Sequence, residues 1–142
     1  MKKVLFILLA VVLVPMFVYA AGSSVTCTAS DTGIKQAVVV TCAAVGDDSD
    51  GSMPNAQINY SGCLINVTTI PGATGPTANY DIVLNSKYGI DVTEGALANR
   101  HTSNAEEVEF LPAECYDGML TMVISNTSVN DATLTIEILI GR

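Results

Sequence analysis

Basic residues are scarce in this sequence: six lysines and arginines stand against 14 aspartates and glutamates, for a formal net charge of −8 at pH 7. A chain with this excess of negative charge is not suited to hold nucleic acid or an anionic membrane surface by bulk electrostatics. We therefore expect neither as a partner. The same excess favours solubility and permits cation binding.

Histidine and the common catalytic motifs are almost absent. His101 is the one histidine, in the polar segment 98–104, so any imidazole-based mechanism has to use it. No Gly-x-Ser-x-Gly elbow, His-Glu-x-x-His pair or phosphate-binding glycine loop occurs. Glu106, Glu107 and Glu109 could offer paired carboxylates for glycoside chemistry, but solvated charge on a strand near a sheet edge is the ordinary interpretation. We expect no catalytic residue and no enzymatic activity.

Aromatic residues are also few. The chain lacks tryptophan, and Phe110 is the one phenylalanine after residue 21. A stacking surface for sugars or bases would therefore have to use the tyrosines that follow residue 21, namely Tyr60, Tyr80, Tyr88 and Tyr116. Tyr80 alternates with Ile82 on a predicted strand and is expected in the core.

The N-terminal segment differs from the rest of the chain. Lys2 and Lys3 precede an apolar run over 4–18, and Val18-Tyr19-Ala20 offers a cleavage site, a pattern typical of a secretory signal peptide. An uncleaved anchor is the alternative. We expect cleavage after Ala20, a single domain over 21–142 and no membrane association of the mature chain, whose four basic and 14 acidic residues give a formal charge of −10.

Four cysteines, Cys27, Cys42, Cys63 and Cys115, lie after the predicted signal. An even number of cysteines in an exported chain indicates two disulfides. Zinc binding is the alternative, but no Cys-x-x-Cys pair occurs and His101 is the one histidine available. We expect Cys27 to pair with Cys42, because segments 25–29 and 37–43 can form a hairpin. Cys63 with Cys115 follows by elimination.

Helical periodicity is almost absent after residue 21, whereas β-branched residues are abundant in the apolar segments. This pattern predicts an all-β, two-sheet antiparallel sandwich resembling a jelly roll. The alternation is clearest near the C-terminus, where Leu134, Ile136, Ile138 and Ile140 share one face. The predicted strands are residues 25–29, 36–44, 57–61, 64–70, 79–85, 106–111, 119–125 and 133–140.

Loop segments 46–55 and 71–77 are dense in glycine, proline and polar residues. The first contains Asp47, Asp48 and Asp50, whose carboxylates could supply oxygen ligands to calcium. The segment lacks the full EF-hand pattern, because Gln57 stands where the terminal glutamate belongs. A solvated turn explains the same residues, so we expect no cofactor, and calcium is the alternative.

The order of features from about residue 34 onward resembles small virion-associated structural β proteins of tailed bacteriophages. The segments that carry the resemblance are 69–72 (TIPG), 76–82 (PTANYDI), 89–92 (GIDV), 95–100 (GALANR), 118–121 (GMLT) and 134–136 (LTI). The resemblance implies a non-enzymatic component of a capsid or tail surface that works by self-association. No functional residue carries over from it.

Two features depart from that family, whose members are assembled in the cytoplasm and generally lack export signals and paired cysteines. This chain could therefore be an exported relative, such as a subunit of an extracellular filament. We expect a secreted, extracellular or periplasmic protein, with a virion surface as a further location, whose partner is itself or a larger surface assembly.

Two hypotheses describe how such a protein would work. In the first, its apolar last strand, which ends near Arg142, pairs with a neighbour's sheet edge; the alternative is that this strand is central in its sheet. In the second, the protein is a secreted binding module whose loops, including 47–55 and 99–104, recognise a glycan or cell-surface partner with the help of calcium.

Overall fold

The computed structural model describes residues 22–33 and 37–141, so the predicted signal peptide lies outside the described residues. Every helix or strand element among the described residues is a β-strand, and each predicted strand is present. The strands are β1 (Ser24–Asp31), β2 (Ala37–Val45), β3 (Ala56–Ile58), β4 (Gly62–Pro71), β5 (Asp81–Asn85), β6 (Glu106–Tyr116), β7 (Leu120–Ser125) and β8 (Thr133–Gly141). No described helix is long and apolar enough to cross a membrane.

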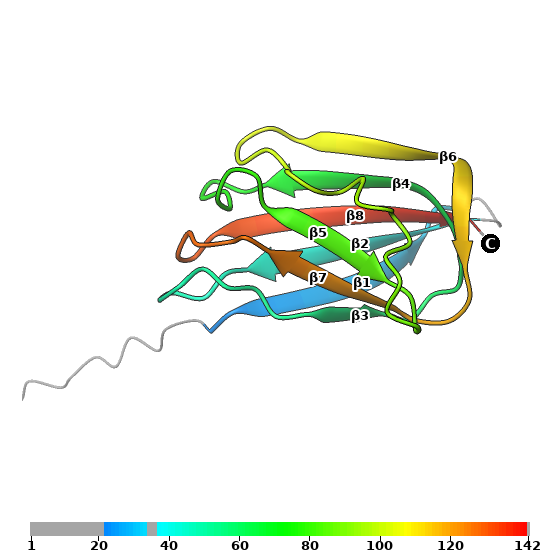
Figure 1. Ribbon diagram of the computed structural model, residues 1–142, viewed down its shortest axis with the longest axis horizontal. Coiled ribbons are helices and arrows are strands. Elements are labelled where there is room, and N and C mark those ends of the chain that lie inside the picture. The colour runs from blue at the N-terminus through cyan, green and yellow to red at the C-terminus, as the bar shows by residue number, and fades with distance from the viewer. Residues whose placement is uncertain (1–21, 34–36, 142) are drawn as a thin grey trace, which may run out of the picture.

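Two antiparallel sheets pack face to face (Figure 1). One has the strand order β1-β2-β8-β4-β6, and the other has the order β3-β7-β5. From β2 to β8, successive strands alternate between the two sheets. This order is that of a jelly roll with β1 added at one edge. The expectation of a two-sheet, jelly-roll-like sandwich is confirmed.

An irregular segment, residues 86–100, lies along β5 where a jelly roll has its remaining strand. The Val92 amide donates to the carbonyl of Leu84 at 2.9 Å, and the Ile82 amide donates to the carbonyl of Leu97 at 3.0 Å. Between these contacts the Asp91 carboxylate accepts the amides of Thr93 and Gly95, and such local bonds compete with a continuous ladder. The segment therefore covers the edge of β5 without forming a strand.

The core lies between the sheets and follows from the alternation of each strand. Leu134, Ile136, Ile138 and Ile140 of β8 are buried, while the residues between them are partly exposed. Because β8 pairs with both β2 and β4, its backbone groups are already used within the sheet. The hypothesis that the last strand pairs with a neighbour's edge is therefore wrong, and the alternative of a central strand is confirmed.

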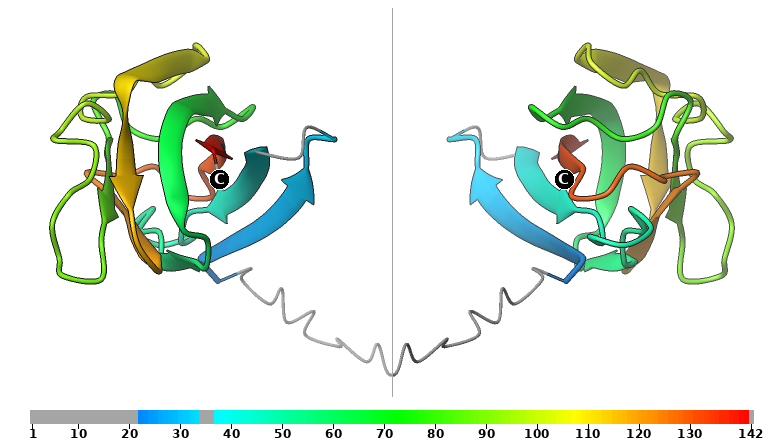
Figure 2. Two further views of the ribbon diagram at one scale, coloured as in Figure 1. Left: turned by 90° about the vertical axis from the view of Figure 1, so that its right-hand side faces the viewer. Right: turned by 90° about the vertical axis from the view of Figure 1, so that its left-hand side faces the viewer.

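Strand β6 is longer than predicted and bends sharply. Its pairing with β4 jumps from Glu109, opposite Asn66, to Glu114, opposite Leu64. The intervening residues 110–113 form a bulge, and a bulge of this kind bends a strand. Beyond it β6 turns toward the smaller sheet and crosses the end of the sandwich (Figures 1 and 2).

Candidate interaction surfaces

Two disulfides join strands of the larger sheet. Cys27 and Cys42 are paired residues of β1 and β2, and Cys63 and Cys115 are paired residues of β4 and β6. Both expected pairings are confirmed, and no described cysteine is free. Disulfides are typical of oxidising compartments, so the pair indicates an extracytoplasmic protein.

The outer edge of β1 presents one set of unpaired backbone groups. The Cα atoms of Cys27 and Cys42 are 4.0 Å apart, a spacing typical of the closer, non-hydrogen-bonded pairs of an antiparallel ladder. The hydroxyls of Thr28 and Ser30 reach the carbonyls of their partners on β2, so those carbonyls point toward β1. The N–H and C=O groups of Val25, Cys27, Ala29 and Asp31 therefore point away from β2.

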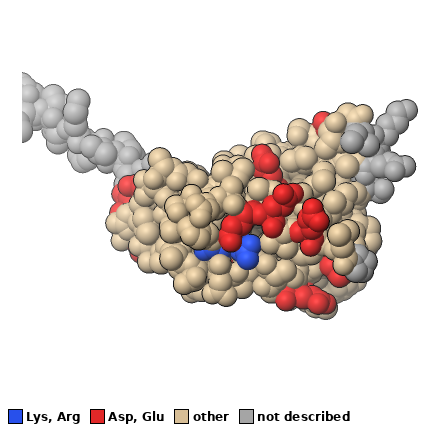
Figure 3. Space-filling model, turned by 90° about the horizontal axis from the view of Figure 1, so that it is seen from above, with Lys and Arg blue, Asp and Glu red and all other residues tan. Residues whose placement is uncertain are grey.

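The other sheet edges are protected within the described part of the chain. Segment 86–100 covers β5, β3 is only three residues long, and β6 is interrupted by its bulge. β6 also carries Glu106, Glu107, Glu109 and Glu114, and Figure 3, viewed from the side of β6, shows a group of acidic side chains beside a smaller basic patch. Charge, bulges and covering segments are the usual means of blocking edge-to-edge pairing. Among the described residues, none of these protects the edge of β1 over 24–30.

A hollow of about 310 Å³, the terminal pocket, lies where segment 86–92 meets the end of β6. Tyr88 and Ile90 line it and are 77% and 65% exposed, whereas exposed large apolar side chains usually occur singly. The Lys87 ammonium lies 5.2 Å from the centre of the Tyr88 ring and donates to the Asp117 carboxylate at 2.9 Å. That bond raises the pKa of Lys87.

Tyr116 forms one wall of the terminal pocket. Its hydroxyl oxygen is buried without a hydrogen-bond partner among the described residues, and burial raises the pKa of the phenol to about 12. An unpaired buried hydroxyl is costly. The sequence left Tyr116 unassigned, and the structure brings it together with Tyr88 at one end of the sandwich.

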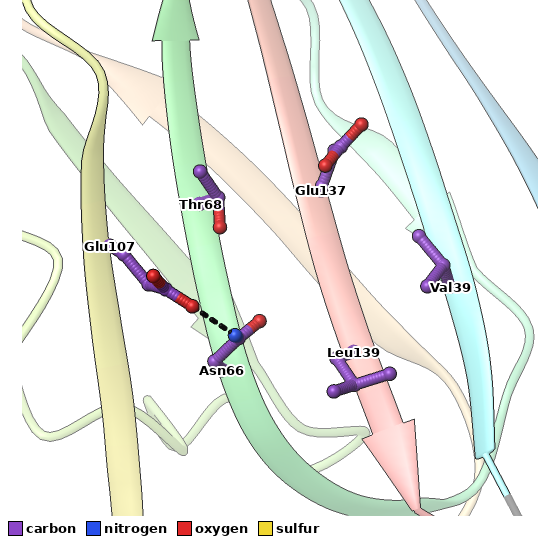
Figure 4. A pocket seen from close by; sticks show the side chains of 6 residues that line it. All are labelled: Val39, Asn66, Thr68, Glu107, Glu137 and Leu139. Atoms are coloured by element: carbon purple, nitrogen blue, oxygen red, sulfur yellow. Dashed lines mark hydrogen bonds between the residues drawn. The ribbon is translucent and has the colours of Figure 1, made fainter. Parts of the chain in front are cut away.

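The outer face of the larger sheet carries a shallow hollow of about 270 Å³. Figure 4 shows its lining, which comes from β2, β4, β6 and β8 and consists of Val39, Asn66, Thr68, Glu107, Glu137 and Leu139. Asn66 donates to Glu107, which fixes that carboxylate on the sheet. The hollow is open and has two carboxylates but no nucleophile with an adjacent base, so it offers no recognisable catalytic arrangement.

The predicted calcium loop folds as a set of local turns. The amide and hydroxyl of Ser49 donate to Asp47 and lower the pKa of that carboxyl, and Asp50 accepts the Ser52 amide at 2.8 Å. Asp48 is exposed. No group of three potential ligands from histidine, cysteine, aspartate and glutamate occurs among the described residues. Calcium at Asp47, Asp48 and Asp50 stays a prediction without support from this geometry.

His101 and Glu106 lie together, but in a structural arrangement. Glu106 accepts the His101 amide at 2.6 Å and lies 3.8 Å from the Arg100 guanidinium. The His101 ring accepts the amides of Ser103 and Asn104 at 3.1 Å. These bonds shape the turn that leads into β6.

The loops that the sequence singled out for binding do lie at the same end of the sandwich. Thr102 donates to the carbonyl of Pro76, and Gly46 donates to the carbonyl of Ala132, while Thr133 donates to the carbonyl of Thr74. These bonds tie the loops into one rim, opposite the end with the terminal pocket (Figure 1).

Two features of these surfaces were not predicted from the sequence. The first is the open edge of β1, which depends on the order of strands in the sheet. The second is the terminal pocket, whose exposed Tyr88 and Ile90 lie in the irregular segment along β5. Comparison with family models and with curated proteins gives no match for the chain, so the resemblance to phage virion proteins stays a prediction.

Proposed function

We propose that this protein is a non-enzymatic structural subunit that associates with itself in an extracellular or virion surface assembly. The observation that carries the proposal is the open edge of β1, which is eight residues long and, among the strands that the structure describes, pairs with β2 alone. Open edges of this length are rare because they template pairing with another chain. In the part of the chain that the structure describes, the other sheet edges are blocked, whereas this one is free over 24–30.

The disulfide of β1 supports the proposal. Cys27 is bonded to Cys42 of β2, so the edge strand is held in an extended shape before any partner arrives. A preorganised strand loses less conformational entropy on association than a flexible one. Two disulfides and a fold without a recognisable catalytic arrangement also suit a subunit that must persist outside the cell.

Self-association is tested by multi-angle light scattering of a chain starting at Ala21, over a range of protein concentrations. We expect the average mass to rise with concentration in the unaltered chain. Ala29→Lys should keep the monomer mass because a lysine on β1 protects the edge. Ala43→Lys, which makes the same change at an exposed position of β2, should assemble normally. A monomer at all concentrations for the unaltered chain would contradict the proposal.

The terminal pocket supports a second candidate, a binding module for a glycan. Its exposed Tyr88 ring and the Lys87–Asp117 ion pair combine an apolar platform with polar groups, as sugar sites do. An array of mono- and oligosaccharides would test it, with Tyr88→Ala as the variant that loses binding. Equal signal from Tyr88→Ala and the unaltered chain would contradict a site at this pocket.

A further inference from the structure

We propose that two copies of this chain pair through β1 in antiparallel orientation about a two-fold axis at Cys27, which joins two five-stranded sheets into one. This inference rests on the proposed self-association and names its partner surface and register. The occupant is a second copy of the chain.

The direction of the pairing follows from charge. Asp31 is the one charged residue of β1. A parallel arrangement would place the two Asp31 carboxylates side by side, whereas an antiparallel arrangement places them at opposite ends of the interface. Because the whole chain is strongly acidic, two copies repel each other least when they meet through a strand that carries little charge.

The register is limited by the faces of the strand. A two-fold axis perpendicular to the sheet keeps each side chain on its own face, and neighbouring residues alternate between faces. The axis must therefore lie between one residue and the same residue of the second copy. Near the middle of β1 this residue is Cys27 or Thr28. An axis at Thr28 would place Asp31 directly opposite Val25 of the second copy, whereas an axis at Cys27 pairs Val25 with Ala29 and leaves Asp31 opposite Ser23.

Backbone hydrogen bonding fits the axis at Cys27. The outward N–H and C=O groups of β1 belong to Val25, Cys27 and Ala29, as the spacing of Cys27 and Cys42 indicates. These residues would exchange hydrogen bonds with Ala29, Cys27 and Val25 of the second copy. On the outer face of the sheet, Thr26 would lie opposite Thr28 of the second copy in a closer, non-hydrogen-bonded pair, and threonine pairs stabilise antiparallel sheets.

The register is tested by disulfide trapping with chains that start at Ala21 and carry either Thr26→Cys or Thr28→Cys. Opposed residues of a non-hydrogen-bonded pair are close enough for a disulfide. We expect a covalent dimer when the two variants are mixed under mild oxidation, and little dimer from either variant alone. Peptide mapping should show the two native disulfides intact.

A dimer from Thr28→Cys alone would place the axis at Thr28 and overturn the inference. Absence of trapping in every mixture, together with a concentration-dependent mass in light scattering, would also overturn the inference while leaving the proposed function standing. A constant monomer mass would remove both.

A proline substitution gives an independent measure of the interface. Ala29→Pro removes an outward N–H group while keeping the bonds between β1 and β2, because proline is tolerated at the solvent side of an edge strand. We expect the dissociation constant of the dimer to be higher than that of the unaltered chain by a factor of about ten or more. An unchanged dissociation constant, with circular dichroism showing a folded variant, would contradict pairing through this edge.

Discussion

Cys27 and Cys42 face each other across β1 and β2 as a close pair, bonded through their sulfur atoms. The pair fixes which backbone groups of β1 are spent on the sheet and which point outward. It also holds the strand at the edge, where only one neighbour stabilises it. The disulfide and the free edge are therefore parts of one arrangement.

Removing either disulfide should destabilise the domain, and the second should matter more. The Cys27–Cys42 bond closes a loop of 15 residues and the Cys63–Cys115 bond one of 52, for which loop-closure entropy gives about 3 and about 4 kcal/mol. Urea unfolding of the Cys27→Ser/Cys42→Ser and Cys63→Ser/Cys115→Ser double variants measures both costs. A Cys63→Ser/Cys115→Ser variant as stable as the unaltered chain would contradict a structural role for that bond.

Gly51 is required for a close approach as well as for its backbone conformation. Its φ is +72°, and a Cβ there would lie 2.5 Å from the Val129 backbone nitrogen. Gly89 has a similar φ of +77° but open space around it. We expect Gly89→Ala to cost about 1 kcal/mol and Gly51→Ala clearly more, as measured by the free energy of unfolding. Equal losses of unfolding free energy for the two variants would show that the backbone around Val129 can move to make room for the added methyl group.

The Asp81 carboxylate should matter far more than an exposed one. It accepts the Asn99 amide at 2.8 Å and a side-chain bond from Asn126, which join β5 to its covering segment and to the turn after β7. Asp81→Ala should therefore cost about 1–3 kcal/mol. Asp117→Ala removes a surface ion pair with Lys87 and should cost less than about 1 kcal/mol. Similar thermal midpoints for the two variants would contradict this role.

Tyr116→Phe should leave the domain as stable as before at neutral pH, or more stable by up to about 1 kcal/mol, because it removes an unpaired buried hydroxyl. Burial raises the pKa of Tyr116 from 10.0 to about 12, so the unfolded chain loses this proton first as the pH rises. The free energy of unfolding of the unaltered chain is therefore at its full value below pH 10 and falls as the pH rises toward 12.

The difference in unfolding free energy between the unaltered chain and Tyr116→Phe should therefore change over that interval. Tyr88→Phe, at an exposed ring, is the control and should follow the unaltered chain at each pH. A parallel course for all three proteins would show that the Tyr116 hydroxyl is solvated.

The alternation of apolar and polar residues along each strand is what allows the strands and their buried faces to be predicted from the sequence. Strands such as β8 show which residues face the core, because burial of one face imposes a period of two. The Cys27–Cys42 pair followed from a hairpin, a contact between neighbours in the chain. These features depend on short stretches of sequence.

The order of strands depends on contacts between distant segments, and alternation does not encode it. The apolar character of β8 fitted both an edge and a centre, and only its pairing with β2 and β4 decides between them. The length of β6 was also missed, because the bulge over 110–113 contains a proline that normally ends a strand. The open edge of β1 could not be predicted for the same reason, because the position of a strand within its sheet depends on contacts between distant segments.

Amide hydrogen exchange, measured by NMR at low and high protein concentration, tests pairing through β1 most directly. The amides of Thr26, Thr28 and Ser30 point toward β2 and should be protected at both concentrations. We predict that the amides of Val25, Cys27 and Ala29 exchange freely in the dilute protein and become protected in the concentrated one. Free exchange of these three amides at a concentration where light scattering detects assembly would contradict the account.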